Sequence, residues 1–184
     1  MSQVLVPGLS RRQIRKLADH IRDLIEIPAN KPFPIVTLLE MLSAPIYEDS
    51  PTQIGIPALE LEIVEDEDLQ GNYAEYRPAN NTMVIRRSVY EGAYEGRGRD
   101  RFTLAHELGH FLLHGYPDYR FARNEEHVPK YQDPEWQANT FASMLLIPRG
   151  EIFGMSVEEV AQRYQVSKSA AQIALSQAEP SKTT

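Results

Sequence analysis

Residues Arg101 to His114 read Arg-Phe-Thr-Leu-Ala-His-Glu-Leu-Gly-His-Phe-Leu-Leu-His and contain the pattern His106-Glu107-x-x-His110. On a helix, side chains four positions apart lie on the same face, so both imidazoles can contact one ion. Glu107 projects beside them, where it can take a proton from a water molecule. Imidazole is a good zinc ligand, and a catalytic zinc keeps three protein ligands and one open position. The stretch therefore predicts a catalytic metal site on a helix.

This helix is apolar on nearly every side, which is typical of a buried helix. An alternative interpretation is a core helix whose histidines are satisfied by hydrogen bonds alone. A buried glutamate without a partner is rarely tolerated, so we favour the metal site. Asp100 is the expected N-cap. The apolar positions are Phe102, Leu104, Ala105, Leu108, Phe111, Leu112 and Leu113.

A third ligand must come from outside this helix. The extended pattern H-E-x-x-H-x-x-G-x-x-H is absent, because its Gly and His positions hold Leu113 and Tyr116. His114 lies about 6 Å along the helix axis from His110, which is too far to join the same ion. We interpret His114 as a helix-end residue.

A second helix is predicted between Pro134, which suits a first helical turn, and Pro148, which ends the apolar run. Glu135 and Asn139 are four residues apart and share a face of this helix. We take Glu135 as the third ligand and Asn139 as a residue that orients one of the histidines. A loop holds ligand geometry less well, but four other candidates stay open there: Glu125, Glu126, His127 and Asp133.

These two helices together resemble the ImmA/IrrE family of metallo-endopeptidases. The matching blocks are R-F-T-L-A-H-E-L-G-H-F-L-L-H and E-x-x-A-N-x-F-A-x-x-L-L-I-P, within residues 99–148. Many zincins share the first block, and the second narrows the resemblance to this family. The resemblance implies a zinc site made by His106, His110 and Glu135, with Glu107 as the catalytic base. It also implies a regulator protein as substrate, since known members cut helix-turn-helix repressors.

The whole chain is predicted to have an α+β fold with a small zincin-like core. In it, a short antiparallel sheet packs on the two ligand helices. Ser10 with Gln13 is a capping-box pattern, and apolar residues at helical spacing predict an amphipathic helix over residues 11–27. A second helix is expected over residues 35–42. We interpret the basic face of the first helix as solvated; it carries Arg11, Arg12, Arg15, Lys16 and Arg22.

Strand patterns occupy residues 45 to 86. Residues 45–48 are a short candidate, and Leu59, Leu61 and Ile63 alternate with glutamates as in a half-buried strand. Residues 73–77 and 82–86 flank a Pro-Ala-Asn-Asn turn and predict a hairpin. We expect this hairpin to line the cleft, because an edge strand there can pair with an extended substrate.

Two segments next to the ligand helices have no clear periodicity. Residues 88–98 are interpreted as a polar, Gly-rich connection, and residues 115–133 as a loop that could cover the cleft. A donor that stabilises the oxyanion of the tetrahedral intermediate is expected in one of them. The sequence leaves eight candidates: Tyr90, Tyr94, Arg97, Arg99, Tyr116, Tyr119, Arg120 and His127.

Residues 156–178 resemble a helix-turn-helix, with Val166 and Ser167 where that motif turns. Gln165 occupies the position usually held by glycine, and the second helix offers only Lys168 and Gln172 to a DNA groove. DNA binding requires neutralisation of phosphates. We therefore expect a structural two-helix lobe rather than direct nucleic-acid binding, followed by a loose end at residues 179–184.

Composition limits the remaining possibilities. The chain has 184 residues, a net charge of −7, 42% hydrophobic residues and no cysteine. We expect one metallopeptidase domain over 1–184, with N-terminal helices at 10–43, a catalytic core at 44–148 and the C-terminal lobe. The negative charge disfavours general affinity for nucleic acid or anionic membranes. Without a signal-like or membrane-length apolar run, and without cysteine, a cytoplasmic protein is expected.

Two hypotheses for function follow. The first is a zinc-dependent endopeptidase that cuts a protein substrate, a helix-turn-helix transcriptional repressor. The second is a regulator that binds a repressor or DNA without cutting. A complete Glu107 beside both histidines favours the first hypothesis.

Overall fold

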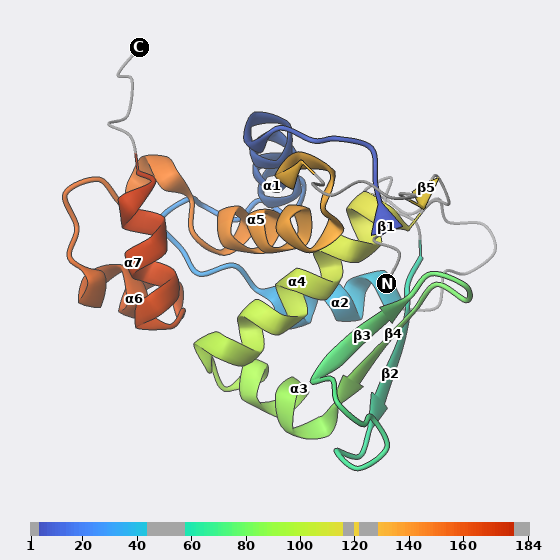
Figure 1. Cartoon of the computed structure of the whole chain (residues 1–184). Coiled ribbons are helices and arrows are strands. Elements are labelled where there is room, and N and C mark those ends of the chain that lie inside the picture. Colours follow the sequence, from blue (N-terminus) through green and yellow to red (C-terminus); the bar gives the residue numbers. More distant parts are fainter. Residues whose placement is uncertain (1–3, 44–57, 116–119, 122–128, 179–184) are drawn as a thin grey trace.

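Helix α4 (Gly98–His114) crosses the middle of the computed structural model, which describes residues 4–43, 58–115, 120–121 and 129–178 (Figure 1). Helix α5 (Pro134–Leu146) packs along one side of α4, and a three-stranded sheet lies on the other side. Gly109 permits the close approach of α5, because a Cβ at this position would lie 3.1 Å from the Cα of Ala138. The predicted α+β fold with a buried central helix is confirmed.

The N-terminal helices are α1 (Arg11–Leu24) and α2 (Ile35–Ser43). The predicted capping box between Ser10 and Gln13 is present, although α1 ends at Leu24 rather than at residue 27. Ile14, Ala18 and Ile21 recur at helical spacing and are buried. Their apolar face packs α1 against α5, on the side of α5 away from the sheet.

Arg22 does not lie on the solvated face of α1, where it was predicted. It is buried, and its guanidinium donates to the carbonyl oxygens of Leu145, Pro28 and Lys31, each at 2.8 Å. A long side chain can extend from a helix edge to carbonyls elsewhere in the fold, which the periodicity of its own helix does not reveal. Arg22 therefore joins α1 to the end of α5 and to the loop before α2.

The sheet contains β2 (Glu60–Val64), β3 (Ala74–Arg77) and β4 (Thr82–Arg86) in the order β2-β4-β3. The predicted hairpin is confirmed as the antiparallel pair β3–β4. The sheet is nevertheless mixed, because β2 pairs with β4 in parallel, with Leu61 opposite Met83. The prediction of a wholly antiparallel sheet was wrong for β2.

The burial of β4 explains this arrangement. Met83, Val84 and Ile85 are consecutive and all buried, so both faces of β4 are covered, as in a central strand. In β2, by contrast, Glu60 and Glu62 are exposed. After β2 the chain forms β3 at the opposite edge of the sheet and then turns back. The returning strand β4 therefore lies between β2 and β3. β3 becomes the edge strand that faces α4.

Residues 87–94 form helix α3 (Arg87–Tyr94), where a polar connection was predicted. Val89 and Ala93 bury one face of this helix against the rest of the fold. Gly92 lies inside this helix, and because glycine has a poor helix propensity, the sequence did not predict a helix here. The N-cap of α4 is Arg97, so Asp100, the predicted N-cap, lies within the first turn of α4.

The remaining elements are short. Strands β1 (Val4–Leu5) and β5 (Arg120–Phe121) pair antiparallel, and 3-10 turns η1 (Lys130–Gln132) and η2 (Arg149–Glu151) precede and follow α5. The candidate strand at 45–48, most of the predicted cleft-covering loop and the expected loose end at 179–184 lie outside the described residues. Within the described part of the chain, no helix combines the length and apolar character that a bilayer crossing requires.

The C-terminal lobe consists of α6 (Val157–Tyr164) and α7 (Lys168–Ser176). Buried Arg101 of α4 connects this lobe to the core: its Nε donates to the Gln165 carbonyl at 3.0 Å, and its Nη2 donates to the Phe33 carbonyl at 2.7 Å. Gln165 has φ of +52° at the turn between the helices, a left-handed conformation that favours glycine. The carbonyl contact with Arg101 holds the turn in this conformation.

Replacement of Gly98 tests this attachment. Glycine to alanine within a helix normally stabilises by about 1 kcal/mol. Here the added Cβ would lie 2.4 Å from the carbonyl carbon of Val166 and 2.5 Å from the amide nitrogen of Ser167. We expect Gly98→Ala to destabilise the protein by about 1–3 kcal/mol in urea unfolding. Gln172→Ala at an exposed α7 position is the control, with an expected change within about 0.5 kcal/mol. A Gly98→Ala variant as stable as the parent would contradict the packing of the lobe on α4.

Candidate metal centre

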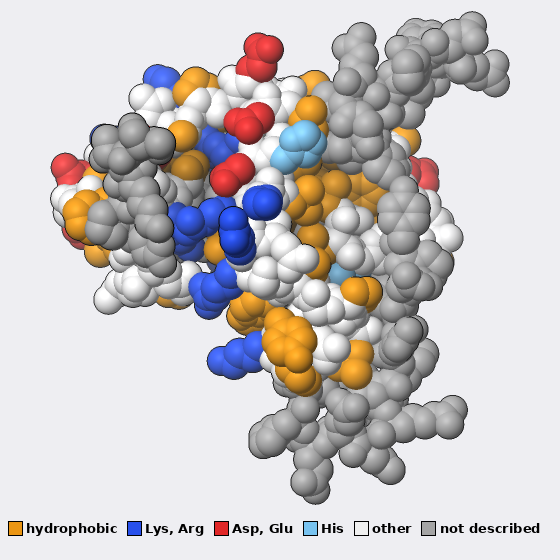
Figure 2. Space-filling model, turned by 90° about the horizontal axis from the view of Figure 1, so that it is seen from above, with side chains coloured by type: hydrophobic (Ala, Val, Ile, Leu, Met, Phe, Trp, Pro, Cys, Tyr) orange, Lys and Arg blue, Asp and Glu red, His pale blue; other side chains and the backbone are white. Residues whose placement is uncertain are grey.

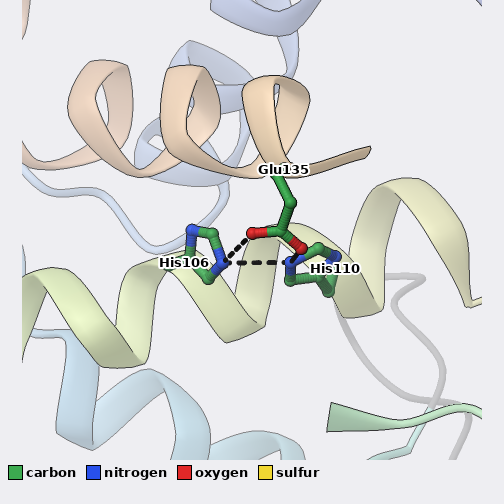
Figure 3. A group of neighbouring side chains, drawn as sticks. All are labelled: His106, His110 and Glu135. Carbon is green, nitrogen blue, oxygen red and sulfur yellow. Dashed lines mark hydrogen bonds and ion pairs between the residues drawn. The ribbon is translucent and has the colours of Figure 1, made fainter. Parts of the chain in front are cut away.

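The structure brings three of the predicted site residues together (Figure 3). His106 and His110 project from one face of α4, and Glu135 reaches down to them from the first turn of α5. The Nε2 atoms of the two histidines are 3.0 Å apart. The Glu135 carboxylate oxygens lie 3.3 Å from Nε2 of His106 and 3.2 Å from Nε2 of His110. The start of α5 is fixed by Asp133, whose side chain accepts from the Glu135 amide at 3.0 Å.

These separations suit a metal ion. Four tetrahedral ligands at about 2.0–2.1 Å from a central ion are about 3.3 Å from one another. The three measured distances lie close to that value, and the group consists of two imidazoles and one carboxylate. His106, His110 and Glu135 can therefore hold a metal ion, with one coordination position left open.

The local charges also favour a cation between these side chains. Hydrogen bonds from His106 and His110 hold the pKa of Glu135 well below its usual range. Burial lowers the pKa of His106, but Glu135, Glu107 and Asn139 outweigh it, and the net effect is a raised pKa. Both shifts express the attraction of this acidic pocket for positive charge, which a proton satisfies here and a metal ion can satisfy as well.

Asn139 fixes the orientation of His106, in the position predicted for it. Its Oδ1 lies 3.2 Å from Nδ1 of His106. Because an amide oxygen only accepts hydrogen bonds, Nδ1 carries a proton, and Nε2, which faces Glu135, is the nitrogen whose lone pair a metal ion can bind. The side chain one turn along α5 from Glu135 thus sets the tautomer of the first histidine.

His110 is oriented by a longer chain of contacts that the sequence did not reveal. Its Nδ1 lies 3.1 Å from Nδ1 of His114, and Nε2 of His114 lies 3.0 Å from Oε1 of Gln137. The Gln137 amide group donates to the carbonyls of Pro7 at 2.9 Å and Tyr131 at 2.7 Å. Its oxygen must therefore accept from Nε2 of His114. Burial lowers the pKa of His114 to about 4, so this side chain is neutral at pH 7.

The direction of these bonds determines how His110 faces the site. Neutral His114 carries its proton on Nε2, so its Nδ1 accepts the proton of Nδ1 of His110. Nε2 of His110 therefore faces Glu135 beside Nε2 of His106 and is the nitrogen available to a metal ion. His114 does end α4, as predicted, but it is also a buried partner of His110. The spacing of four residues between the two histidines was the available signal.

Glu107 lines the same cleft but stays outside the group of three. Its Oε2 accepts a hydrogen bond at 2.9 Å from the backbone amide of Tyr76 in edge strand β3. Burial raises the pKa of Glu107, although this hydrogen bond and the two histidines oppose the rise. The carboxylate is thus held in place by the strand and made more basic by its surroundings.

The cleft has a volume of about 360 Å³ and a largely polar lining. The prediction that the hairpin lines it is confirmed, and β3 is the strand that does so. The described lining residues are Asn72, Ala74, Glu75, Tyr76, Pro78, His106, Glu107, His110 and Glu135.

The predicted oxyanion donors do not reach this cleft among the described residues. Tyr90 hydrogen-bonds to Glu40, and the Arg99 guanidinium stacks 4.3 Å from the Tyr73 ring centroid. Tyr94 and Arg97 are likewise absent from the lining. The side chains of Tyr116, Tyr119, Arg120 and His127 lie outside the described residues, as do the alternative ligands Glu125 and Glu126.

Asn72, for which the sequence predicted no role at the site, also lines the cleft. Its Nδ2 donates to Oε2 of Glu75 at 3.1 Å. Asp133, the fourth alternative ligand, is occupied as the N-cap of α5.

The chain matches a known protein family. The family model described as the IrrE N-terminal-like domain, Peptidase M78, matches residues 60–176, which is more than half of the chain. The matched range includes the sheet, both helices of the metal centre and the two helices of the C-terminal lobe. No curated protein matches the chain.

Gln137→Leu tests the buried chain of contacts behind His110. The substitution removes the hydrogen bonds that Gln137 makes to His114 and to the carbonyls of Pro7 and Tyr131, and each lost buried hydrogen bond costs about 1–3 kcal/mol. We expect a loss of about 2–4 kcal/mol in the free energy of unfolding, measured in urea on metal-free protein. Asn139→Ala, at an exposed position, removes one contact to a histidine and should cost less than about 1 kcal/mol. If both variants lost the same free energy of unfolding, the buried contacts of Gln137 would contribute no more than the exposed contact of Asn139.

Proposed function

The chain belongs to the IrrE N-terminal-like, Peptidase M78 family, a metallopeptidase family, and we propose that it is a zinc-dependent endopeptidase that cuts a protein substrate. The observation that carries the proposal is the convergence of two imidazole Nε2 atoms and the Glu135 carboxylate within 3.3 Å of one another, with Glu107 in the same cleft.

His106, His110 and Glu135 would hold the zinc ion. Two neutral imidazoles and one carboxylate are a donor set that zinc favours in catalytic sites. When bound there, zinc supplies a positive charge that acidifies water and polarises the scissile carbonyl. Asn139 and His114 support this role, because each keeps a histidine in the tautomer that offers Nε2.

Glu107 acts as the general base. Its Oε2 is fixed by the Tyr76 amide, and its Oε1 has no hydrogen-bond partner among the described residues. Oε1 can therefore take the proton of the attacking water and later deliver it to the leaving amine. Burial favours both steps, since it raises the pKa of the carboxyl toward the value at which one group can accept and donate.

The substrate would bind as an extended strand along β3. The Arg86 amide donates to the Tyr73 carbonyl at 3.1 Å, so the backbone of Tyr73 turns toward β4 and that of Ala74 turns away from it. The outward groups of Ala74 can pair with a peptide laid across the metal centre. This mode requires an unfolded or flexible segment in the substrate. We propose a helix-turn-helix repressor, on the resemblance of both motif blocks to the ImmA/IrrE family.

The alternative, a regulator that binds DNA through the C-terminal lobe, has less support. Lys168, one of the two side chains expected to reach a groove, forms a salt bridge with Glu158 at 3.0 Å. The lobe is also anchored to α4 through Arg101, which fits a structural role.

Metal content provides the first test. We expect about one zinc per chain in the reconstituted protein by elemental analysis, and its loss in Glu135→Ala, since two imidazoles alone hold zinc weakly. Glu75→Ala is the matched control, because Glu75 lines the cleft but lies outside the group of three, and it should retain zinc. Full zinc in Glu135→Ala would place the third ligand elsewhere.

Glu107→Gln separates catalysis from metal binding. The amide keeps the shape of the side chain but cannot accept a proton. We expect unchanged zinc content and a loss of cleavage of about 10²–10⁴-fold, followed by mass spectrometry of a co-incubated repressor. Cleavage at the parental rate would remove Glu107 from the mechanism, while loss of zinc would indicate that it acts on the metal.

A further inference from the structure

A second cavity, of about 370 Å³, is lined by residues of α1, α4, α5 and α7 and by Arg149. Its volume is within the range of small-molecule sites, about 300–1,000 Å³. Most of its wall is apolar and includes Phe102, Trp136 and Ile173, while Arg11, Ser143 and Arg149 supply polar groups. It shares no lining residue with the cleft at the metal centre.

Arg149 is the unusual feature of this cavity. The residue is only 5% exposed, and its Nη2 donates to Oγ of Ser143 at 2.8 Å. Its Nε and Nη1 are buried and have no hydrogen-bond partner among the described residues. Burial, with the positive charges of Arg15 and Arg11, lowers the pKa of Arg149 to about 10, so the guanidinium stays charged at pH 7. A buried charge without a counter-ion is costly unless an anion pairs with it.

The neighbouring charges have the same sign. Arg11 lies with its guanidinium 5.6 Å from the Trp136 ring centroid and donates to Oε1 of Gln177 at 2.8 Å. Among the described residues, no carboxylate forms a salt bridge with Arg11, Arg15 or Arg149. Figure 2 shows Lys and Arg side chains gathered in the middle of the face over α1, next to exposed hydrophobic side chains. This local excess of positive charge is notable in a chain of net charge −7.

We propose that this cavity binds an organic anion, with a carboxylate or phosphate group paired to Arg149 and Arg11 and an apolar part against Phe102, Trp136 and Ile173. Arg149 lines the cavity, and its buried charge has no counter-ion among the described residues, so the negative group of a ligand in the cavity would offset it. The exposed guanidinium of Arg11 can donate to carboxylate or phosphate oxygens. The apolar wall favours an alkyl or aromatic group over a bare inorganic ion.

The ligand would touch the support of the metal centre. Asn139 lines the cavity, and its Oδ1 is the atom that lies 3.2 Å from Nδ1 of His106. Trp136 follows Glu135 directly in α5. A ligand in the cavity would therefore contact the residue of α5 that orients His106. Anion binding itself requires no metal. Failure of the proposed peptidase activity would leave this site intact.

The test is a binding titration on metal-free protein with octanoate and with phenyl phosphate. Trp136 is the only tryptophan of the chain and lines the cavity, so its fluorescence reports occupancy. Octanol, which lacks the charge, and inorganic phosphate, which lacks the apolar part, are the control ligands. We expect a saturable change with at least one organic anion and at least tenfold weaker binding of both controls, with calorimetry as the second measurement.

Variants identify the site. Arg149→Met and Arg11→Ala should each weaken binding of the organic anion at least tenfold, whereas Arg12→Ala, one residue along α1 and exposed, should change it less than twofold. The ligand-free Arg149→Met variant should melt at the parental temperature or above, since it removes an unpaired buried charge. Weaker binding with retained stability supports the site. A lower melting temperature in Arg149→Met together with parental binding would show that Arg149 is structural.

A last comparison identifies the source of the anion. A leucyl-phenylalanine dipeptide carries an apolar body and a free carboxylate. Tighter binding of this dipeptide than of octanoate would assign the site to a peptide terminus, and the reverse order would assign it to a small metabolite. The proposal is overturned if neither organic anion binds, if octanol binds as tightly, or if Arg149→Met binds as the parent does.

Discussion

Close packing of α4 against α5 is the contact on which the rest of the structure depends. Gly109 lets the backbone at Ala138 approach so closely that an added Cβ would lie only 3.1 Å from the Cα of Ala138. At this separation, Glu135 in the first turn of α5 reaches the two histidines of α4, and Asn139 one turn later reaches the rear nitrogen of His106. The candidate metal centre of two histidines and one glutamate is thus a consequence of how near two helices lie.

The buried polar side chains between α4 and α5 are hydrogen-bonded to groups on the side away from the cleft. Gln137, on the buried side of α5, connects His114 to backbone carbonyls at Pro7 and Tyr131. A buried polar network stabilises a fold when every member has a partner, and it also fixes directions. Here it fixes which nitrogen of His110 faces Glu135. The N-terminal segment therefore contributes to the metal centre without supplying a ligand.

The sheet contributes the other half of the site. Edge strand β3 holds Glu107 through the Tyr76 amide and borders the cleft beside the three metal-binding side chains. The same strand that would align an extended peptide therefore also orients Glu107, the proposed base. Helix α5 also lines the cationic cavity around Arg149, through residues that include Trp136 and Asn139, so the helix that supplies Glu135 contacts two chemically different sites.

The sequence by itself determined what depends on spacing along the chain. The pair His106 and His110, the adjacent Glu107, the start of α5 at Pro134, and the β3–β4 hairpin all follow from local periodicity and turn chemistry. The family assignment follows from the same two blocks, within the matched residues 60–176.

Tertiary structure alone decided the parallel pairing of β2, the buried hydrogen bonds of Arg22, the partner of His114 and the unpaired charge of Arg149. Each depends on atoms far apart in the chain. The period of a helix or strand gives the direction of a side chain, but it does not give the distant group that the side chain meets.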